Sequence, residues 1–209
     1  MATVLLLTSS ALAGASISNQ LVQDAVALLR SDDPTLQVIA RDVGHRPVPH
    51  LTLDSATALR GAEPANEAQA AALALSNELI AELTAADTLV IGAPMYNFGI
   101  SSTLKAWFDY VLRSGVTFRY TENGPVGLLK AKRAIVIVTR GGVYSEGPAR
   151  VMDSQEPHLR TLLGFMGITD VTFVRAEKLA LGPEPRQQGI SAARLQLTHA
   201  IQKQFRQAA

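Results

Sequence analysis

Short apolar runs recur along the chain, and each is long enough for one β-strand. They cover residues 2–7, 36–40, 88–93, 134–139 and 171–176. Three of these runs are nearly continuous and rich in Val, Ile and Leu, whereas a half-exposed antiparallel strand would alternate apolar with polar residues. The pattern therefore predicts the strands of a parallel sheet that is covered on both faces.

The segments between these runs carry apolar residues at helical spacing. They cover residues 17–29, 66–83, 101–112, 157–165 and 187–205. In the second segment Asn66 can cap the start, and Leu79 and Leu83 share a face. Regular alternation of strand and helix, with right-handed crossovers, predicts a doubly wound α/β sheet with helices on both faces. We expect the strand order 2-1-3-4-5 within one domain, residues 1–209.

Two stretches interrupt this alternation. Residues 43–64 carry several prolines, and they are too irregular for one helix and too long for an ordinary turn. In residues 113–128, the piece 116–120 is typical of a short strand and the piece 121–125 of a turn. Long excursions in a compact domain are usually functional or part of an interface, although plain surface connections are the alternative.

Composition and charge exclude several functional classes. With 47% hydrophobic residues the chain can form a core, and its net charge of +1 gives no broad field for a polyanion, so we expect no nucleic-acid partner. The sequence has no Cys, which excludes disulfides and thiol chemistry and favours a reducing, cytoplasmic location. No apolar run approaches the roughly 20 residues of a membrane span, so we expect no membrane partner.

The loop after the first strand has the composition of a phosphate site. Residues 8–19 are small or carry hydroxyls, have no charge, and lead into a helix. A helix N-terminus binds phosphate because its amides are unpaired and its dipole favours negative charge. We predict Ser10, Ser16 and Ser18 as ligands, with ordinary N-capping as the alternative. Without a Walker lysine or the dinucleotide glycine spacing, a phosphate monoester is favoured over a nucleoside triphosphate.

Two further loops complete the candidate site. After the third strand, Tyr96 and Phe98 offer flat apolar surface and Asn97 offers an amide, which suits a planar heteroaromatic ring, with core packing as the alternative. After the fourth strand, residues 139–144 contain a Gly-Gly pair where backbone can approach a ligand. In the order 2-1-3-4-5 these strands are neighbours, so one ligand can contact all three loops.

Four motifs in register resemble one family of enzymes. They are Ser9-Ser10 with residues 16–21, Pro94-Met95-Tyr96-Asn97-Phe98, residues 118–125, and Thr139-Arg140-Gly141-Gly142. This set is similar to the FMN-dependent NADH-azoreductase family of flavodoxin-like quinone and azo-dye reductases. The similarity extends through residues 163–170 to 182–184, so it covers nearly the whole chain.

The resemblance implies an FMN cofactor and assigns residues to it. Those residues are Ser10, Ser16, Ile17 and Ser18 at the phosphate, Met95, Tyr96, Asn97 and Phe98 along the isoalloxazine, and Thr139, Arg140, Gly141 and Gly142 at its pyrimidine edge. A homodimer with active sites at the interface is also implied, in which each flavin is partly covered by the other subunit. The candidate substrate-binding residues are then Tyr120 and Leu162, and Leu162 stands where the family often has an aromatic residue.

The activity that the resemblance implies is ping-pong hydride transfer from NADH or NADPH through flavin N5 to quinones and azo compounds. We expect no catalytic acid or base from the protein, because the flavin carries the chemistry. The donors we expect at the ring are backbone amides around Asn97 and the Gly141-Gly142 pair. Three arginines, Arg60, Arg119 and Arg140, could meet the dinucleotide phosphates or stay solvated.

Two other functions use the same fold. One is an electron shuttle or flavin sensor that does not turn over NAD(P)H, although the net charge of +1 differs from the acidic surface of such shuttles. The other is a phosphate-binding or phosphatase domain without a flavin. We predict no metal site, because the histidines have no metal-like spacing: His45, His50, His158 and His199.

Overall fold

The computed structural model describes residues 2–208, and a parallel sheet of five strands forms its centre. The strands are β1 (Thr3–Thr8), β2 (Gln37–Asp42), β3 (Thr88–Pro94), β6 (Arg133–Thr139) and β7 (Asp170–Ala176). They lie in the order β2-β1-β3-β6-β7, and all neighbours are parallel. The predicted order 2-1-3-4-5 describes the same neighbours, because a separate hairpin takes the two intervening numbers.

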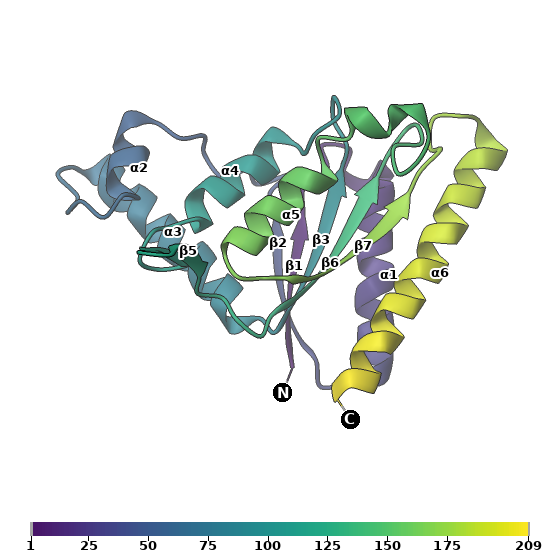
Figure 1. Ribbon diagram of the computed structural model, residues 1–209, viewed down its shortest axis with the longest axis horizontal. Helices are drawn as coiled ribbons and strands as arrows, with labels where there is room; N and C mark the ends of the chain where they lie inside the picture. Colours follow the sequence, from purple (N-terminus) through teal and green to yellow (C-terminus); the bar gives the residue numbers. More distant parts are fainter. Residues whose placement is uncertain (1, 209) are drawn as a thin grey trace.

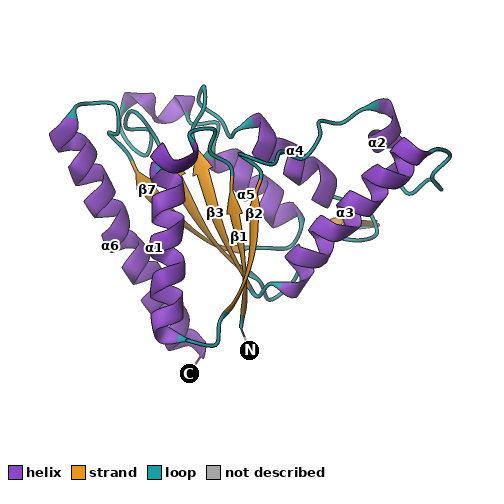
Figure 2. Cartoon of the chain, turned by 180° about the vertical axis from the view of Figure 1, so that it is seen from behind, coloured by secondary structure: helices purple, strands orange, loops and turns teal. Residues whose placement is uncertain are grey.

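Helices cover both faces of this sheet, as Figures 1 and 2 show. On one face lie α1 (Ile17–Asp32) and α6 (Pro183–Ala208), which contact each other. On the other face lie α3 (Glu67–Ala85), α4 (Ser102–Val111) and α5 (Glu156–Phe165). Two short 3-10 turns, η1 (Ala13–Ala15) and η2 (Pro148–Met152), lie in connecting loops. The predicted helices are all present with small shifts at their ends.

Two apolar cores flank the sheet, because side chains alternate across each strand. In β1, Leu5 and Leu7 belong to the core on the side of α3, α4 and α5, whereas Val4 and Leu6 belong to the core on the side of α1 and α6. Full burial of such a side chain contributes roughly 1.5–3 kcal/mol to folding. Both faces of the central strands are therefore apolar, which explains their continuous apolar runs. Within residues 2–208, no helix has the length and apolarity needed to cross a membrane.

Three of the longer helices, α1, α3 and α4, begin with a polar side chain that caps a backbone amide. Ser16, Asn66 and Ser101 each accept a hydrogen bond from the amide three residues later, at 3.2, 2.8 and 3.1 Å. The predicted cap at Asn66 is confirmed. Because α1 and α4 start just beyond the carboxyl ends of β1 and β3, the caps at Ser16 and Ser101 fix the two helix N-termini nearest the candidate site.

The first irregular stretch contains a helix that sequence reasoning missed. This helix, α2 (Leu53–Ala58), begins with a capping box in which Thr52 and Ser55 bond each other's backbone amides. It packs on α3, and the Asp54 carboxylate accepts hydrogen bonds from Asn66 and Gln69. Tertiary contacts with α3 therefore stabilise a helix that is too short to form alone.

The second irregular stretch forms an antiparallel hairpin of β4 (Phe118–Thr121) and β5 (Gly124–Gly127). Its first strand and turn were predicted, but its second strand was not. Gly127 lies against the turn after α5, where a side chain would overlap the backbone of Met166 and Gly167. The Leu129 amide donates to the Met166 carbonyl at 2.9 Å in the same region. These contacts anchor the hairpin to the domain.

We predict that Gly127→Ala destabilises the protein by about 1–3 kcal/mol, because the new methyl overlaps backbone that cannot move aside cheaply. The matched control is Gly164→Ala, because Gly164 lies inside α5 and a methyl there meets no atom within 4 Å. This control should gain about 0.5–1 kcal/mol from helix propensity. Urea unfolding followed by circular dichroism measures both changes. Equal effects of the two substitutions would contradict the anchoring role of Gly127.

Candidate functional site

Three loops meet at the carboxyl edge of the sheet, which is at the top of Figure 1. The Ala11 amide in the first loop donates to the Tyr96 hydroxyl at 3.0 Å. The Met95 amide donates to the Thr139 carbonyl at 2.9 Å, and the rings of Phe98 and Tyr144 meet edge to face with centroids 6.1 Å apart. The structure thus brings together the loops that sequence reasoning expected to converge.

The serines of the first loop are almost completely buried. Ser10, Ser16 and Ser18 are 4%, 2% and 0% exposed. Ser16 caps α1, and its Oγ lies 2.9 Å from the Ser18 Oγ. Ser18 lies close to Gly92 of β3, so its hydroxyl is turned into the fold. The groups best placed for an anion are therefore the amides of the first helical turn, including those of Ile17 and Ser18, which have no intrahelical acceptor.

The second loop forms a tight turn with unusual backbone geometry. Tyr96 and Gly99 exchange both backbone hydrogen bonds at 3.0 Å, and the intervening Asn97 and Phe98 have φ values of 47° and 71°. Asn tolerates this left-handed region, but a bulky residue such as Phe is strained there. Phe98 is 45% exposed, so it is not a core residue. Among the described residues, no acceptor pairs with the Asn97 or Phe98 amide.

The third loop presents its amides in the same way. The carbonyls of Arg140, Gly141 and Gly142 accept hydrogen bonds from the amides of residues 178–180, at 3.0–3.1 Å. In the described part of the chain, the amides of Gly141 and Gly142 have no such partner. Four backbone amides from two adjacent loops are therefore available at this edge. They can donate to the acceptor atoms of a ligand.

The three arginines that the sequence left open occupy different environments. Arg60 and Arg119 are exposed. Arg140 is 1% exposed and is paired with Asp153 and Glu177, so the expectation of a solvated or phosphate-binding side chain is wrong for this residue. Only the backbone of Arg140 can contact a ligand at the site. Its partners lie at least 13 residues away along the chain, so the local sequence gave no signal of the pairing.

The structure does not bring the two predicted substrate residues to these loops. Tyr120 lies on the hairpin, is 71% exposed, and touches the Phe118 ring edge to face. Leu162 lies on α5 and packs half-buried against the apolar core. No interaction within residues 2–208 joins either side chain to the three loops.

Sequence reasoning missed a glycine that supports the first loop. A side chain at Gly44, just after β2, would overlap the carbonyl of Ser10. The amides of Val43 and Gly44 both donate to the Thr8 carbonyl, at 2.8 and 3.3 Å. Beside this contact is a hollow of about 410 Å³, whose lining includes Ser9, Gly44, Tyr96 and Asn97. A glycine two residues after the end of a strand is the only sequence signal for this role.

Comparison with known proteins places the chain in a family. A family model described as a flavodoxin-like fold matches residues 2–201. Over 202 residues the chain is 52% identical to the FMN-dependent NADH:quinone oxidoreductase of Hyphomonas neptunium, and 97% of each chain is covered. The chain belongs to the FMN-dependent NADH:quinone oxidoreductase family. The resemblance drawn from the sequence motifs is therefore confirmed.

Other members and neighbours of this family agree. The FMN-dependent NADH:quinone oxidoreductase of Escherichia coli O9:H4 is 53% identical over 185 residues, which cover 88% of this chain and 90% of that protein. The crystal structure of an azoreductase from Bacillus anthracis has a TM-score of 0.87 at 29% identity, and the match covers 97% of this chain and 100% of that one.

For this member of the family we predict that Tyr96→Phe weakens the contact between the first two loops. Loss of the hydrogen bond from the Ala11 amide should lower the free energy of unfolding by about 1 kcal/mol and speed hydrogen exchange at that amide. Urea unfolding and amide exchange measure the two effects. Tyr144→Phe is the control, since its hydroxyl has no partner among the described residues. Unchanged exchange at Ala11 in Tyr96→Phe would show that the hydroxyl does not hold the loop.

Proposed function

We propose that the protein is an FMN-dependent NADH:quinone oxidoreductase that also reduces azo compounds. The observation that carries the proposal is the set of free amides on two loops beside the N-terminus of α1. A helix N-terminus suits a phosphate, and a row of fixed amides suits the acceptor edge of a planar ring. FMN has both groups at its two ends.

The residues present fit FMN at each end. At the phosphate end, the uncharged first loop and the first turn of α1 supply hydroxyls and amides, with Ser10, Ser16, Ile17 and Ser18 as the candidate contacts. The dipole of α1 adds attraction for the negative charge. The small side chains leave space close to the backbone. This donor set is one that binds a phosphate monoester without a metal.

At the ring end, the chain supplies orientation and fixed donors. Met95, Tyr96, Asn97 and Phe98 would lie along the ring, and Thr139, Arg140, Gly141 and Gly142 would contact its pyrimidine edge through backbone. Bound FMN supplies hydride acceptance from NADH and hydride donation to a quinone or an azo compound. Amides held in place before the ligand arrives stabilise negative charge on that edge at little cost in reorganisation.

We predict that Ser16→Asp weakens FMN binding at least about 100-fold, because a carboxylate would face the phosphate dianion. Asp is a good N-cap, so α1 should still form. Ser191→Asp, on the exposed surface of α6, is the matched control and should bind FMN like the wild type. Fluorescence titration of FMN into the apoprotein measures the affinity. Wild-type affinity in Ser16→Asp would remove Ser16 from the site.

The activity itself is tested by following NADH oxidation with menadione and with an azo dye. The proposal expects turnover with both acceptors and parallel initial-rate lines, as one shared site requires. Bound flavin without NADH oxidation would indicate an electron shuttle or sensor instead. Failure to bind FMN would leave only the fold in common with the relatives.

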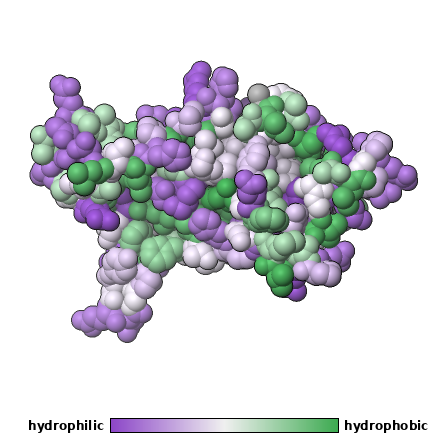
Figure 3. All heavy atoms as spheres, turned by 90° about the horizontal axis from the view of Figure 1, so that it is seen from above, coloured by the Kyte–Doolittle hydropathy of each residue, from purple (hydrophilic) through white to green (hydrophobic). Residues whose placement is uncertain are grey.

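We further propose a homodimer in which each site takes Tyr120 from the other subunit. Tyr120 is exposed on a hairpin and lies away from the three loops of its own chain. Its ring is therefore available to contact the site of another subunit. Other large apolar side chains are also exposed, among them Leu12, Phe98 and Val151. Figure 3, which looks onto the carboxyl edge, shows apolar patches between polar ones on this face.

A mixed dimer tests this arrangement. The wild type should sediment at twice the chain mass of 22.3 kDa. Tyr120→Ala should lose at least about tenfold in kcat/KM for quinones, and Ser16→Asp should lose its flavin. If Tyr120 acts on the partner's site, a heterodimer of the two variants has one intact site and regains about half of the wild-type activity. No recovery, or a monomeric wild type, would contradict the shared site.

The proposal also includes a single domain over residues 1–209, the use of NADPH as an alternative donor, and a cytoplasmic location. Exposed Arg60 and Arg119 are candidates for contact with the dinucleotide phosphates. Limited proteolysis, donor kinetics of the Arg60→Ala and Arg119→Ala variants, and cell fractionation check these three parts separately.

A further inference from the structure

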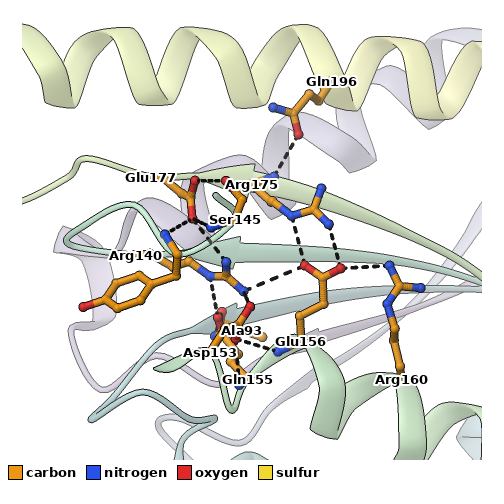
Figure 4. A network of polar contacts seen from close by, with 11 residues as sticks. Ala93, Arg140, Ser145, Asp153, Gln155, Glu156, Arg160, Arg175, Glu177 and Gln196 are labelled. Atoms are coloured by element: carbon orange, nitrogen blue, oxygen red, sulfur yellow. Dashed lines mark hydrogen bonds and ion pairs between the residues drawn. The ribbon is translucent and has the colours of Figure 1, made fainter. Parts of the chain in front are cut away.

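Arg140 is the one charged residue that is buried among those the structure describes, and it lies directly after β6. Every nitrogen of its guanidinium has an acceptor (Figure 4). Nε donates to the Gln155 Oε1 at 3.0 Å, Nη1 donates to the Glu177 Oε1 at 3.2 Å, and Nη2 donates to the Asp153 Oδ2 at 2.8 Å. This arrangement uses the whole fork of the side chain, which lysine cannot reproduce.

The three acceptors tie together the ends of three strands. Gln155 connects Arg140 to β3, because its Nε2 donates to the Ala93 carbonyl at 2.8 Å. Glu177 follows β7, and its Oε1 accepts hydrogen bonds from the amides of Tyr144 and Ser145 at 2.8 and 3.0 Å. Arg140 therefore joins β3, β6 and β7 at the edge where the candidate site lies. It also holds both ends of the loop formed by residues 140–155.

The same loop supports the neighbouring turn of the site. The Ser154 amide donates to the Phe98 carbonyl at 3.0 Å, and the Tyr144 ring meets the Phe98 ring. A shift of residues 140–155 would thus move the Gly141 and Gly142 amides and also the Asn97–Phe98 turn. All four free amides depend on this one loop.

The charge of Arg140 is balanced by two carboxylates that pair with it directly and by a third carboxylate that lies farther out. Asp153 and Glu177 pair with Arg140 directly, and Glu156, whose carboxylate lies 3.9 Å from Nη2, is held from outside by Arg160 and Arg175. Burial alone would raise the pKa of Glu177, but hydrogen bonds from Ser145, the Tyr144 amide and Arg140 outweigh it and lower the pKa. Glu177 is therefore an anion at neutral pH and a firm acceptor for the loop amides.

We infer that Arg140 is a positioning residue, whose side chain holds the Gly141-Gly142 amides and the Asn97–Phe98 turn in register for the ligand without contacting the ligand itself. A buried ion pair is a poor way to gain stability, because its desolvation offsets most of the attraction. A directional fork instead fixes the orientation of loop backbone that no regular element supports. The identity of the ligand in this inference rests on the proposed function. The role of Arg140 in ordering the loop does not depend on that function.

The test uses Arg140→Met, which keeps much of the volume and removes the fork, with Arg140→Lys as the conservative variant. The matched control is Arg133→Met, which removes the ion pair to Asp170 between the same two strands at their opposite ends. Hydrogen exchange of the apoprotein is measured first. We expect exchange in residues 141–155 to rise at least about tenfold in Arg140→Met, less in Arg140→Lys, and to stay unchanged in Arg133→Met.

FMN affinity and turnover are measured next on the same proteins. Arg140→Met should bind FMN at least about tenfold more weakly, and at saturating FMN its kcat should still be reduced about fivefold or more. A residue that only stabilised the fold would regain wild-type kcat once the cofactor is saturating. Unchanged loop exchange, or full recovery of kcat, would overturn the inference.

Misfolding of Arg140→Met and failure of the wild type to bind FMN have different consequences for the inference. If Arg140→Met does not fold, Glu177→Gln decides, because its amide oxygen still accepts from Tyr144 and Ser145 while one of the two carboxylate charges paired directly with Arg140 is gone. We expect faster exchange in residues 141–155 and about threefold weaker FMN binding in this variant, and wild-type values would overturn the inference. If the wild type does not bind FMN, the proposed function fails, and the exchange data alone still decide the role of Arg140 in ordering the loop.

Discussion

Parallel pairing of β1 with β3 and of β3 with β6 aligns Thr8 with Gly92 and Pro94 with Thr139. Because these three strands end within two residues of one another in register, the loops that follow them share one edge. The contacts between Ala11 and Tyr96 and between Met95 and Thr139 then become possible. Close packing of α1 on β3 has the same consequence, since a methyl at Gly92 would lie 3.0 Å from Val22. The N-terminus of α1 is thereby held over the edge where the loops meet. A change in register would separate the phosphate end of the site from the ring end.

In the part of the chain that the structure describes, the loop after β6 uses its first backbone carbonyls internally and leaves the amides of its glycine pair free. The carbonyls of residues 140–142 are bonded to the loop after β7, whereas the amides of Gly141, Gly142, Asn97 and Phe98 have no acceptor within the described chain. An edge with free amides and the positive end of α1 attracts acceptors and negative charge. The left-handed geometry of Phe98 fits this account, because strain in a bulky residue persists only where the surrounding contacts enforce it. The kind of ligand that this edge can bind therefore depends on which backbone groups, carbonyls or amides, are already bonded within the fold.

The sequence predicted the regular elements because their signals are local. Apolar runs of strand length, three of them nearly continuous, identified the five strands of the sheet. The cap at Asn66 and the helical spacing identified the long helices. By contrast, α2 depends on hydrogen bonds from Asn66 and Gln69 to Asp54, and β5 is a four-residue strand with glycine at both ends, so neither has a local pattern. The loops of the site were found from small, hydroxyl and glycine residues after strands. The directions of the side chains were not found in this way. Ser18 points inward because it packs against β3, and Arg140 is buried against partners that lie far along the chain.

The two ends of β6 show why a buried arginine suits the carboxyl edge. At the amino end Arg133 meets Asp170 at 3.3 Å with both side chains partly exposed, and nothing there requires a fixed loop. At the carboxyl end the chain must hold the Gly141 and Gly142 amides in place on a loop that has left the sheet. Apolar contacts are not directional and would let such a segment adopt several arrangements. The planar guanidinium of Arg140 instead donates to three acceptors at once. Two carboxylates and an amide oxygen compensate the cost of burying its charge. Among the described residues, the one buried charge thus lies at the edge where orientation, rather than stability, limits what the protein can bind.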